Sequence, residues 1–207
     1  TPEALAFWRA AGMDREVEAR RRQERPFNFA DVVAPLPPGF RRIRAGDTIT
    51  MGGRRWLIRT GDGHAPEHAT FWSIDDGLVL GGDQLLPSIS ANIGVYPTEP
   101  DADPLSEWLA SCRAFLPVAR TDQLVLPGHK LPFTGLPLRL GQMIDNHVHA
   151  LERLLEHLAL PRRGGECFVP LFGREIDGDG YGLALAETVA HLNHLLAAGQ
   201  VARRRDK

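Results

Sequence analysis

Three short segments of the sequence place a side chain that can bind a metal ion next to glycine. They are 60–68 (Thr-Gly-Asp-Gly-His-Ala-Pro-Glu-His), 80–83 (Leu-Gly-Gly-Asp) and 126–129 (Leu-Pro-Gly-His). Glycine permits a tight backbone turn, so the side chain that follows it can point into a shared pocket. Imidazole suits zinc, iron and manganese, and a carboxylate can bridge two such ions. Each segment alone is a weak signal, but together they predict a centre where metal ions activate water for hydrolysis.

Each of these segments follows a stretch with strand character. Turn residues and alternating apolar side chains predict short strands, and Gly52-Gly53 resembles a hairpin turn between the first two. The expected strands are 48–51, 55–60, 71–74, 78–80 and 124–126. Because strand ends hold loops rigidly, we expect these strands to position the metal-binding side chains.

Helical spacing of apolar residues predicts the other elements. The expected helices are 3–23, 104–116, 138–160 and 182–199, with Thr1 as the first N-cap and Gly199 as the last C-cap. A short strand over 201–204 would follow the last helix. Helices followed by a short β-ribbon indicate a small winged-helix-like appendage.

The three segments resemble motifs of one known family. Residues 63–68 resemble the Gly-His-x-Pro-x-His segment of metallo-β-lactamase-fold hydrolases, the superfamily of glyoxalase II. Residues 79–83 resemble the strand that ends in the family's bridging aspartate, and 125–129 resemble its last metal-ligand segment.

The resemblance implies a role for each of the metal-competent side chains. His64 would bind the first ion, Asp83 would bridge, and His129 would bind the second ion. His68 would support the metal ligands without binding a metal ion itself. The implied cofactors are two divalent metal ions, with zinc the default and iron or manganese as alternatives. No catalytic residue is assigned; Tyr96, Lys130 and the 85–97 loop are expected pocket walls by position alone.

The resemblance also implies a fold and a domain division. The tail resembles a subgroup with a C-terminal winged-helix-like domain, so the likeness covers roughly 40–203. The expected fold is α/β (α+β): the C-terminal part of an αββα sandwich plus that small domain. We expect a partial metallo-β-lactamase-like domain over 1–137, with 1–40 as a helical insertion. The long helix and the winged-helix-like domain would occupy 138–207.

One family signature is absent from the sequence. The string His-x-His-x-Asp-His, which supplies ligands to both ions, does not occur. Its nearest substitute, His147-Val148-His149, falls in a predicted helix, where such positions point apart. His157, His191 and His194 are expected to lie on helix surfaces or in packing contacts. We expect a fragment that lacks the N-terminal part carrying the signature; a degenerate homologue without the site is the alternative.

The predicted function is therefore metal-dependent hydrolysis of a small-molecule ester, thioester, lactone, amide or phosphodiester by the intact parent. The alternative is a non-catalytic homologue, a scaffold or a nucleic-acid-binding protein that uses Arg162-Arg163 and Arg203-Arg204-Arg205 in the tail. The net charge of −2 argues against nucleic acid as a partner. An exposed sheet face would favour association into a homo-oligomer.

The composition indicates the class of protein and the cellular compartment to expect. The chain has 207 residues, 43% hydrophobic and 24% charged, which is ordinary for a soluble globular protein. It has no apolar run of the roughly 18 residues that a membrane span needs, and we expect no signal peptide. Cys112 and Cys167 form no CxxC motif. We expect two reduced thiols in a cytoplasmic protein, although the sequence leaves a disulfide open.

Overall fold

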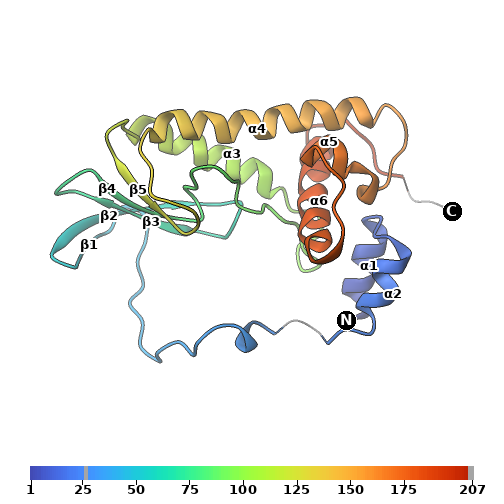
Figure 1. Ribbon diagram of the computed structural model, residues 1–207, viewed down its shortest axis with the longest axis horizontal. Coiled ribbons are helices and arrows are strands. Elements are labelled where there is room, and N and C mark those ends of the chain that lie inside the picture. The colour runs from blue at the N-terminus through green and yellow to red at the C-terminus, as the bar shows by residue number, and fades with distance from the viewer. Residues whose placement is uncertain (26–27, 205–207) are drawn as a thin grey trace.

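The computed structural model describes residues 1–25 and 28–204 (Figure 1). Arg205, the end of the basic run in the tail, lies outside the described residues. The strands are β1 (Thr48–Met51), β2 (Arg54–Gly61), β3 (His68–Ser73), β4 (Leu78–Gly82) and β5 (Leu124–Pro127). The α-helices are α1 (Pro2–Ala10), α2 (Arg15–Arg21), α3 (Pro104–Phe115), α4 (Leu136–His157), α5 (Phe168–Phe172) and α6 (Tyr181–Ala197). Short 3-10 helices are η1 (Phe29–Asp31), η2 (Leu116–Val118), η3 (Gly164–Cys167) and η4 (Gly178–Gly180).

The strands form one five-stranded sheet in the order β1-β2-β3-β4-β5. Neighbours from β1 to β4 are antiparallel, and β5 returns parallel to β4 after the crossover through α3. Strands β2, β4 and β5 consequently run in the same direction, and their carboxyl ends meet at one edge of the sheet. The mixed α/β fold class predicted from the sequence is confirmed.

The hairpin between β1 and β2 turns at Gly52-Gly53, as predicted. Their φ angles are 60° and 76°, in the left-handed region that two consecutive residues with side chains rarely adopt. A two-residue turn with both φ angles positive matches the right-handed twist of the flanking strands. The turn therefore fixes the pairing of Met51 with Arg54.

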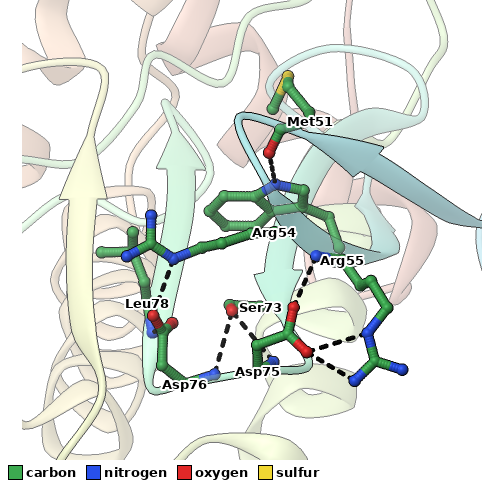
Figure 2. Close-up of polar contacts among 8 residues, drawn as sticks. Met51, Arg54, Arg55, Ser73, Asp75, Asp76 and Leu78 are labelled. Carbon is green, nitrogen blue, oxygen red and sulfur yellow. Dashed lines mark hydrogen bonds and ion pairs between the residues drawn. The ribbon is translucent and has the colours of Figure 1, made fainter.

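The turn between β3 and β4 is tied back to the start of β2 by two ion pairs (Figure 2). The carboxylate of Asp76 accepts a hydrogen bond from Nε of Arg54 at 2.8 Å. The carboxylate of Asp75 accepts from the backbone N–H of Arg55 at 2.8 Å and from its guanidinium. Hydrogen bonds, first of all from Arg54, lower the pKa of Asp76 to about 2. These contacts fix the register of β2, β3 and β4 at the end of the sheet opposite the carboxyl end of β2.

The hydrophobic core covers one face of the sheet, where α3 and α4 pack (Figure 1). Trp108 of α3 is fully buried at its centre. The strand side chains that belong to this core are Trp72, Val79 and Val125. Their sequence neighbours Phe71, Leu80 and Leu126 alternate to the opposite face and are partly exposed. The described part of the chain thus leaves this second face with partly exposed apolar side chains.

The first predicted helix is in fact two helices. The expectation of one helix over 3–23 is wrong, because α1 ends at Ala10 and α2 begins after its N-cap Asp14. Gly12 has a φ of 84°, and a Cβ there would lie 2.8 Å from Cβ of Arg163. This close approach places both helices against α6, where Met13 joins a cluster with Phe168 and Leu185.

The end of the chain differs from the predicted winged helix. The last helix, α6, ends before Gly199, whose φ of 68° suits the predicted cap. Residues 201–204 form no strand, so the expectation of a β-ribbon there is wrong for the described residues. A strand needs a partner edge, whereas this segment leaves α6 and places Arg203 beside Asp101 at 3.4 Å. The described tail is a group of helices that α4 connects to the sheet (Figure 1). The domain boundary expected after residue 137 stays a prediction.

The two cysteines are free and buried, in agreement with the expectation of reduced thiols. Burial raises the pKa of Cys112 to about 12 and that of Cys167 to about 11. Both side chains are therefore neutral thiols at physiological pH, packed as small apolar groups. No helix within residues 1–25 and 28–204 combines the length and apolar character that membrane crossing requires.

Gly141 in α4 should be replaceable with a gain in stability. An added Cβ would meet no atom within 4 Å, and its φ is not positive. Alanine in a helix interior restricts the unfolded chain more than glycine does, so Gly141→Ala should raise the free energy of unfolding by about 0.5–1 kcal/mol. Urea denaturation of the variant and the wild type measures this difference, and an equal or lower stability would contradict it.

Candidate metal centre

The three predicted segments meet at the sheet edge where β2, β4 and β5 end. His64 lies on the loop after β2, Asp83 directly follows β4, and His129 follows β5. Nε2 of His64 is 3.6 Å from Oδ2 of Asp83, and Nε2 of His129 is 3.5 Å from Oδ1 of the same carboxylate. The structure therefore brings these residues together, with each imidazole facing a different oxygen of one carboxylate.

The loop that carries His64 is held by close packing and backbone contacts. Gly63 has a φ of 99°, and a Cβ there would lie 2.6 Å from the carbonyl oxygen of Pro104. Nδ1 of His64 lies 2.8 Å from the backbone carbonyl oxygen of Asn92, which can only accept a hydrogen bond. Nδ1 therefore carries a proton, and Nε2, which faces Asp83, is the nitrogen available to a metal ion. A carbonyl behind an imidazole is the usual partner of a metal-binding histidine.

Asp83 is oriented by the backbone turn before it and by His68. Gly82 has a φ of 50°, and a Cβ there would overlap Cε1 of His68. The backbone N–H of Asp83 donates to Nε2 of His68 at 3.3 Å. His68 therefore supports the turn from behind, and its Nε2 is occupied by that contact. The supporting role implied by the family resemblance remains a prediction, and the geometry agrees with it.

His129 is placed by a glycine that touches the Asp83 carboxylate. The backbone N–H of Gly128 donates to the carbonyl oxygen of Gly82 at 2.8 Å, which joins the end of β5 to the end of β4. A Cβ at Gly128 would overlap Oδ1 of Asp83. The side chain of His129 is 65% exposed. The outer side of the candidate centre is thus open to a ligand or to further chain.

The donor set fits divalent metal ions. Two nitrogen or oxygen ligands of one tetrahedral zinc ion, each 2.0–2.2 Å from it, lie about 3.3–3.6 Å apart. Both imidazole–carboxylate separations fall at the upper end of that range. A carboxylate with one histidine beside each oxygen can serve two ions. Two histidines and one aspartate do not fill both coordination shells, so other groups would have to complete them.

A buried arginine, which the sequence reasoning missed, holds the loop that follows Asp83. The guanidinium of Arg139 on α4 donates to the carbonyl oxygens of Leu86 at 2.7 Å and Ile89 at 2.9 Å. The same loop carries Asn92, the hydrogen-bond partner of His64. A polar residue at an apolar position of an amphipathic helix is the signal that could have found it.

Arg139→Met should destabilise the protein by about 2–4 kcal/mol, because it leaves the buried carbonyl oxygen of Leu86 and the partly buried one of Ile89 without this donor. Arg153 on the same helix is the matched control. Its guanidinium also donates to two carbonyl oxygens, those of Pro170 and Leu171, but it is exposed. Arg153→Met should cost less than about 1 kcal/mol, because water can replace the lost donor. Urea denaturation compares the two variants, and equal losses would contradict the proposed clamp.

A second group of metal-competent side chains lies between α4 and α6. Nδ1 of His147 is 3.2 Å from Nε2 of His191, and Glu187 completes the group. His149 is exposed on another side of α4, so the prediction that positions 147 and 149 point apart is confirmed. His191 is buried, as a packing residue would be, but its contact with His147 was not predicted. The Glu187-x-x-x-His191 spacing, which puts both on one helix face, was the available signal.

Comparisons with known proteins agree with the geometry. The family described as "Metallo-beta-lactamase-like, C-terminal domain" matches residues 151–207. A β-lactamase domain protein from Burkholderia ambifaria is 35% identical, with a TM-score of 0.86 over 97% of this chain. The chain is similar in sequence and fold to proteins of the metallo-β-lactamase superfamily. A metallo-β-lactamase family protein from Thermus thermophilus is 28% identical, with a TM-score of 0.71 over 95% of this chain.

Another superfamily relative carries a functional description. The protein YqjP of Bacillus subtilis (strain 168), described as a probable metallo-hydrolase, is 29% identical over 161 residues, or 75% of this chain. This chain spans 49% of YqjP and 59% of each of the two solved relatives. The similarity to the two solved relatives covers nearly all of this chain, including the sheet, the crossover helix and the helical tail. The chain itself spans about half the length of these three relatives.

Proposed function

We propose that the full-length protein is a metal-dependent hydrolase whose metal ions bind at His64, Asp83 and His129. The observation that carries the proposal is the position of the two imidazoles beside opposite oxygens of one carboxylate. This geometry supports a binuclear centre, with zinc as the default metal and iron or manganese as alternatives. The substrate would be a small molecule with an ester, thioester, lactone, amide or phosphodiester bond.

Bound metal ions would supply a water molecule made acidic enough to act as a nucleophile near neutral pH. The residues of this chain orient the centre. Asn92 fixes the tautomer of His64, and His68 holds the backbone N–H of Asp83. Because Gly128 has no side chain, the Asp83 carboxylate can lie directly against the turn that carries His129. The chain thus provides a preorganised donor set on rigid strand ends, which hydrolytic metal centres require.

A nucleic-acid-binding or scaffold role is not favoured by the contacts of the tail. Arg203 faces Asp101 at 3.4 Å, and the chain as a whole carries a net charge of −2. A protein that neutralises phosphates needs a concentrated positive surface. We retain the small-molecule substrate as the expected partner.

Metal content and hydrolysis, measured together on the full-length protein, test the proposal. After removal of metal with a chelator, the protein is reloaded with zinc, manganese or iron(II) and assayed with chromogenic esters, thioesters, lactones, amides and phosphodiesters. We expect at least two ions per chain, and hydrolysis that disappears with the chelator and returns with metal. A His129→Gln variant should lose both metal and rate. A full-length protein that binds none of these three metals would refute the proposal.

A further inference from the structure

A cavity that contains several polar side chains lies where α6 packs against α4, apart from the sheet edge. Its volume is about 250 Å³, and its lining includes Ser90, Asn146, His147, Glu187 and His191. The two imidazoles and the carboxylate each offer a ligand atom, and these atoms lie within 4.8 Å of one another. The rest of the lining is apolar and consists of Ala150, Leu171 and Phe172. A polar group of this composition inside a helical interface requires a physical explanation.

The contact between the two histidines has a defined polarity. Nδ1 of His191 lies 2.8 Å from the backbone carbonyl oxygen of Glu187, so Nδ1 carries the proton. The lone pair of its Nε2 therefore faces Nδ1 of His147 at 3.2 Å. Two nitrogen ligands of one tetrahedral zinc ion, each 2.0–2.1 Å from it, lie about 3.3–3.4 Å apart. The imidazoles are thus spaced almost as two ligands of one ion, with a backbone carbonyl fixing one of them.

Burial keeps both imidazoles in the form that binds metal. Desolvation lowers the pKa of His147 to about 3 and that of His191 to about 4, so both rings are neutral at physiological pH. Neutral imidazole is the metal-binding form. Nε2 of His147 is buried and has no hydrogen-bond partner among the described residues.

The carboxylate of Glu187 lacks a compensating positive charge. Burial raises its pKa to about 7. Within residues 1–25 and 28–204 it forms no ion pair with arginine or lysine, and Asn92 donates to its Oε2 at 2.9 Å. A divalent cation would neutralise this partly buried carboxylate, whereas a hydrogen bond between the two imidazoles would not.

We propose that His147, Glu187 and His191 bind one divalent transition-metal ion, at a site separate from His64, Asp83 and His129. Two histidines and one glutamate are a ligand set that zinc accepts, and they leave a fourth position for water or a small anion from the cavity. Asn92 connects the two sites. Its side-chain nitrogen Nδ2 donates to Glu187, and its backbone carbonyl oxygen accepts from His64. The second site would therefore support the loop that orients the first.

Zinc titration of the full-length protein in an Asp83→Asn background tests this site by itself. A chromogenic chelator competes for the metal, and circular dichroism monitors folding. We expect one zinc ion to remain bound, and His191→Gln to weaken that binding by more than the ~10–100-fold that loss of an outer partner costs. Glu187→Gln should also weaken zinc binding. Because this change removes the charge of the side chain and keeps its shape, it is the variant least prone to unfold.

His149→Gln is the matched control, because His149 lies on the same helix but is exposed. It should leave zinc affinity unchanged. Cobalt(II) gives a second readout, since its visible absorption should disappear in Glu187→Gln and persist in His149→Gln. If folded Glu187→Gln and His191→Gln bind zinc as the background does, the pair is only a hydrogen bond between histidines. That result would leave the proposal for Asp83 untouched, because the Asp83 site is already disabled in this background.

Discussion

Asp83→Asn is expected to reduce hydrolysis by the full-length protein by about 10³-fold or more. The change removes the negative charge that lies between the two candidate imidazole ligands, and an amide bridges two cations poorly. Loss of a preorganised electrostatic contact at a reaction centre alone costs about 10²–10³-fold in rate. Metal content should fall with the rate. Steady-state assays with a substrate that the wild type hydrolyses measure the rate, and elemental analysis measures the metal content.

Asp62→Asn is the control for the Asp83 variant. Asp62 lies on the same edge, but its Oδ1 accepts from the backbone N–H of Glu67 at 2.7 Å. Asparagine retains an oxygen that can accept this bond. We expect a change in rate of less than about threefold, in line with the ~0.5 kcal/mol effect of a conservative surface change. An Asp83→Asn protein as active as Asp62→Asn would contradict the role given to Asp83.

Gly128→Ala is the second substitution with a large expected effect. An ideal Cβ would overlap Oδ1 of Asp83 and lie 3.1 Å from the carbonyl carbon of Gly82. The carboxylate would have to leave the position where it faces His129, so metal affinity should fall by at least about tenfold, and overpacking should cost about 1–3 kcal/mol of stability. Zinc titration and thermal unfolding report the two effects separately.

Gly141→Ala is the matched control for this change, since the same methyl group is added in open space. It should bind zinc as the wild type does. Equal zinc affinities of Gly128→Ala and Gly141→Ala would contradict the role given to Gly128 in the turn after β5. Equal affinity would mean that the carboxylate does not need the space that glycine leaves.

The sequence could predict the candidate site at the sheet edge because its signals are local. A strand, a glycine and a polar side chain follow one another within a few residues at His64, Asp83 and His129. The hairpin at Gly52-Gly53 is predictable for the same reason. The backbone conformation of these turns depends on the residues themselves more than on distant packing.

Other features depend on contacts between distant segments and could not be predicted in this way. The break at Gly12 is set by the approach of Arg163, about 150 residues later in the chain. His147 and His191 meet because α4 and α6 pack together, and their spacing on separate helices gives no local signal. The segment 201–204, expected to form a strand, pairs with no other strand in the described part of the chain.

Diffraction from crystals of the zinc-loaded full-length protein, recorded on both sides of the zinc absorption edge, tests the central claim most directly. The anomalous difference map locates zinc without reference to activity or substrate. We expect peaks beside Asp83, one toward Nε2 of His64 and one toward Nε2 of His129. A fully loaded crystal with no anomalous peak within bonding distance of Asp83 would contradict the assignment of His64, Asp83 and His129 as the metal centre.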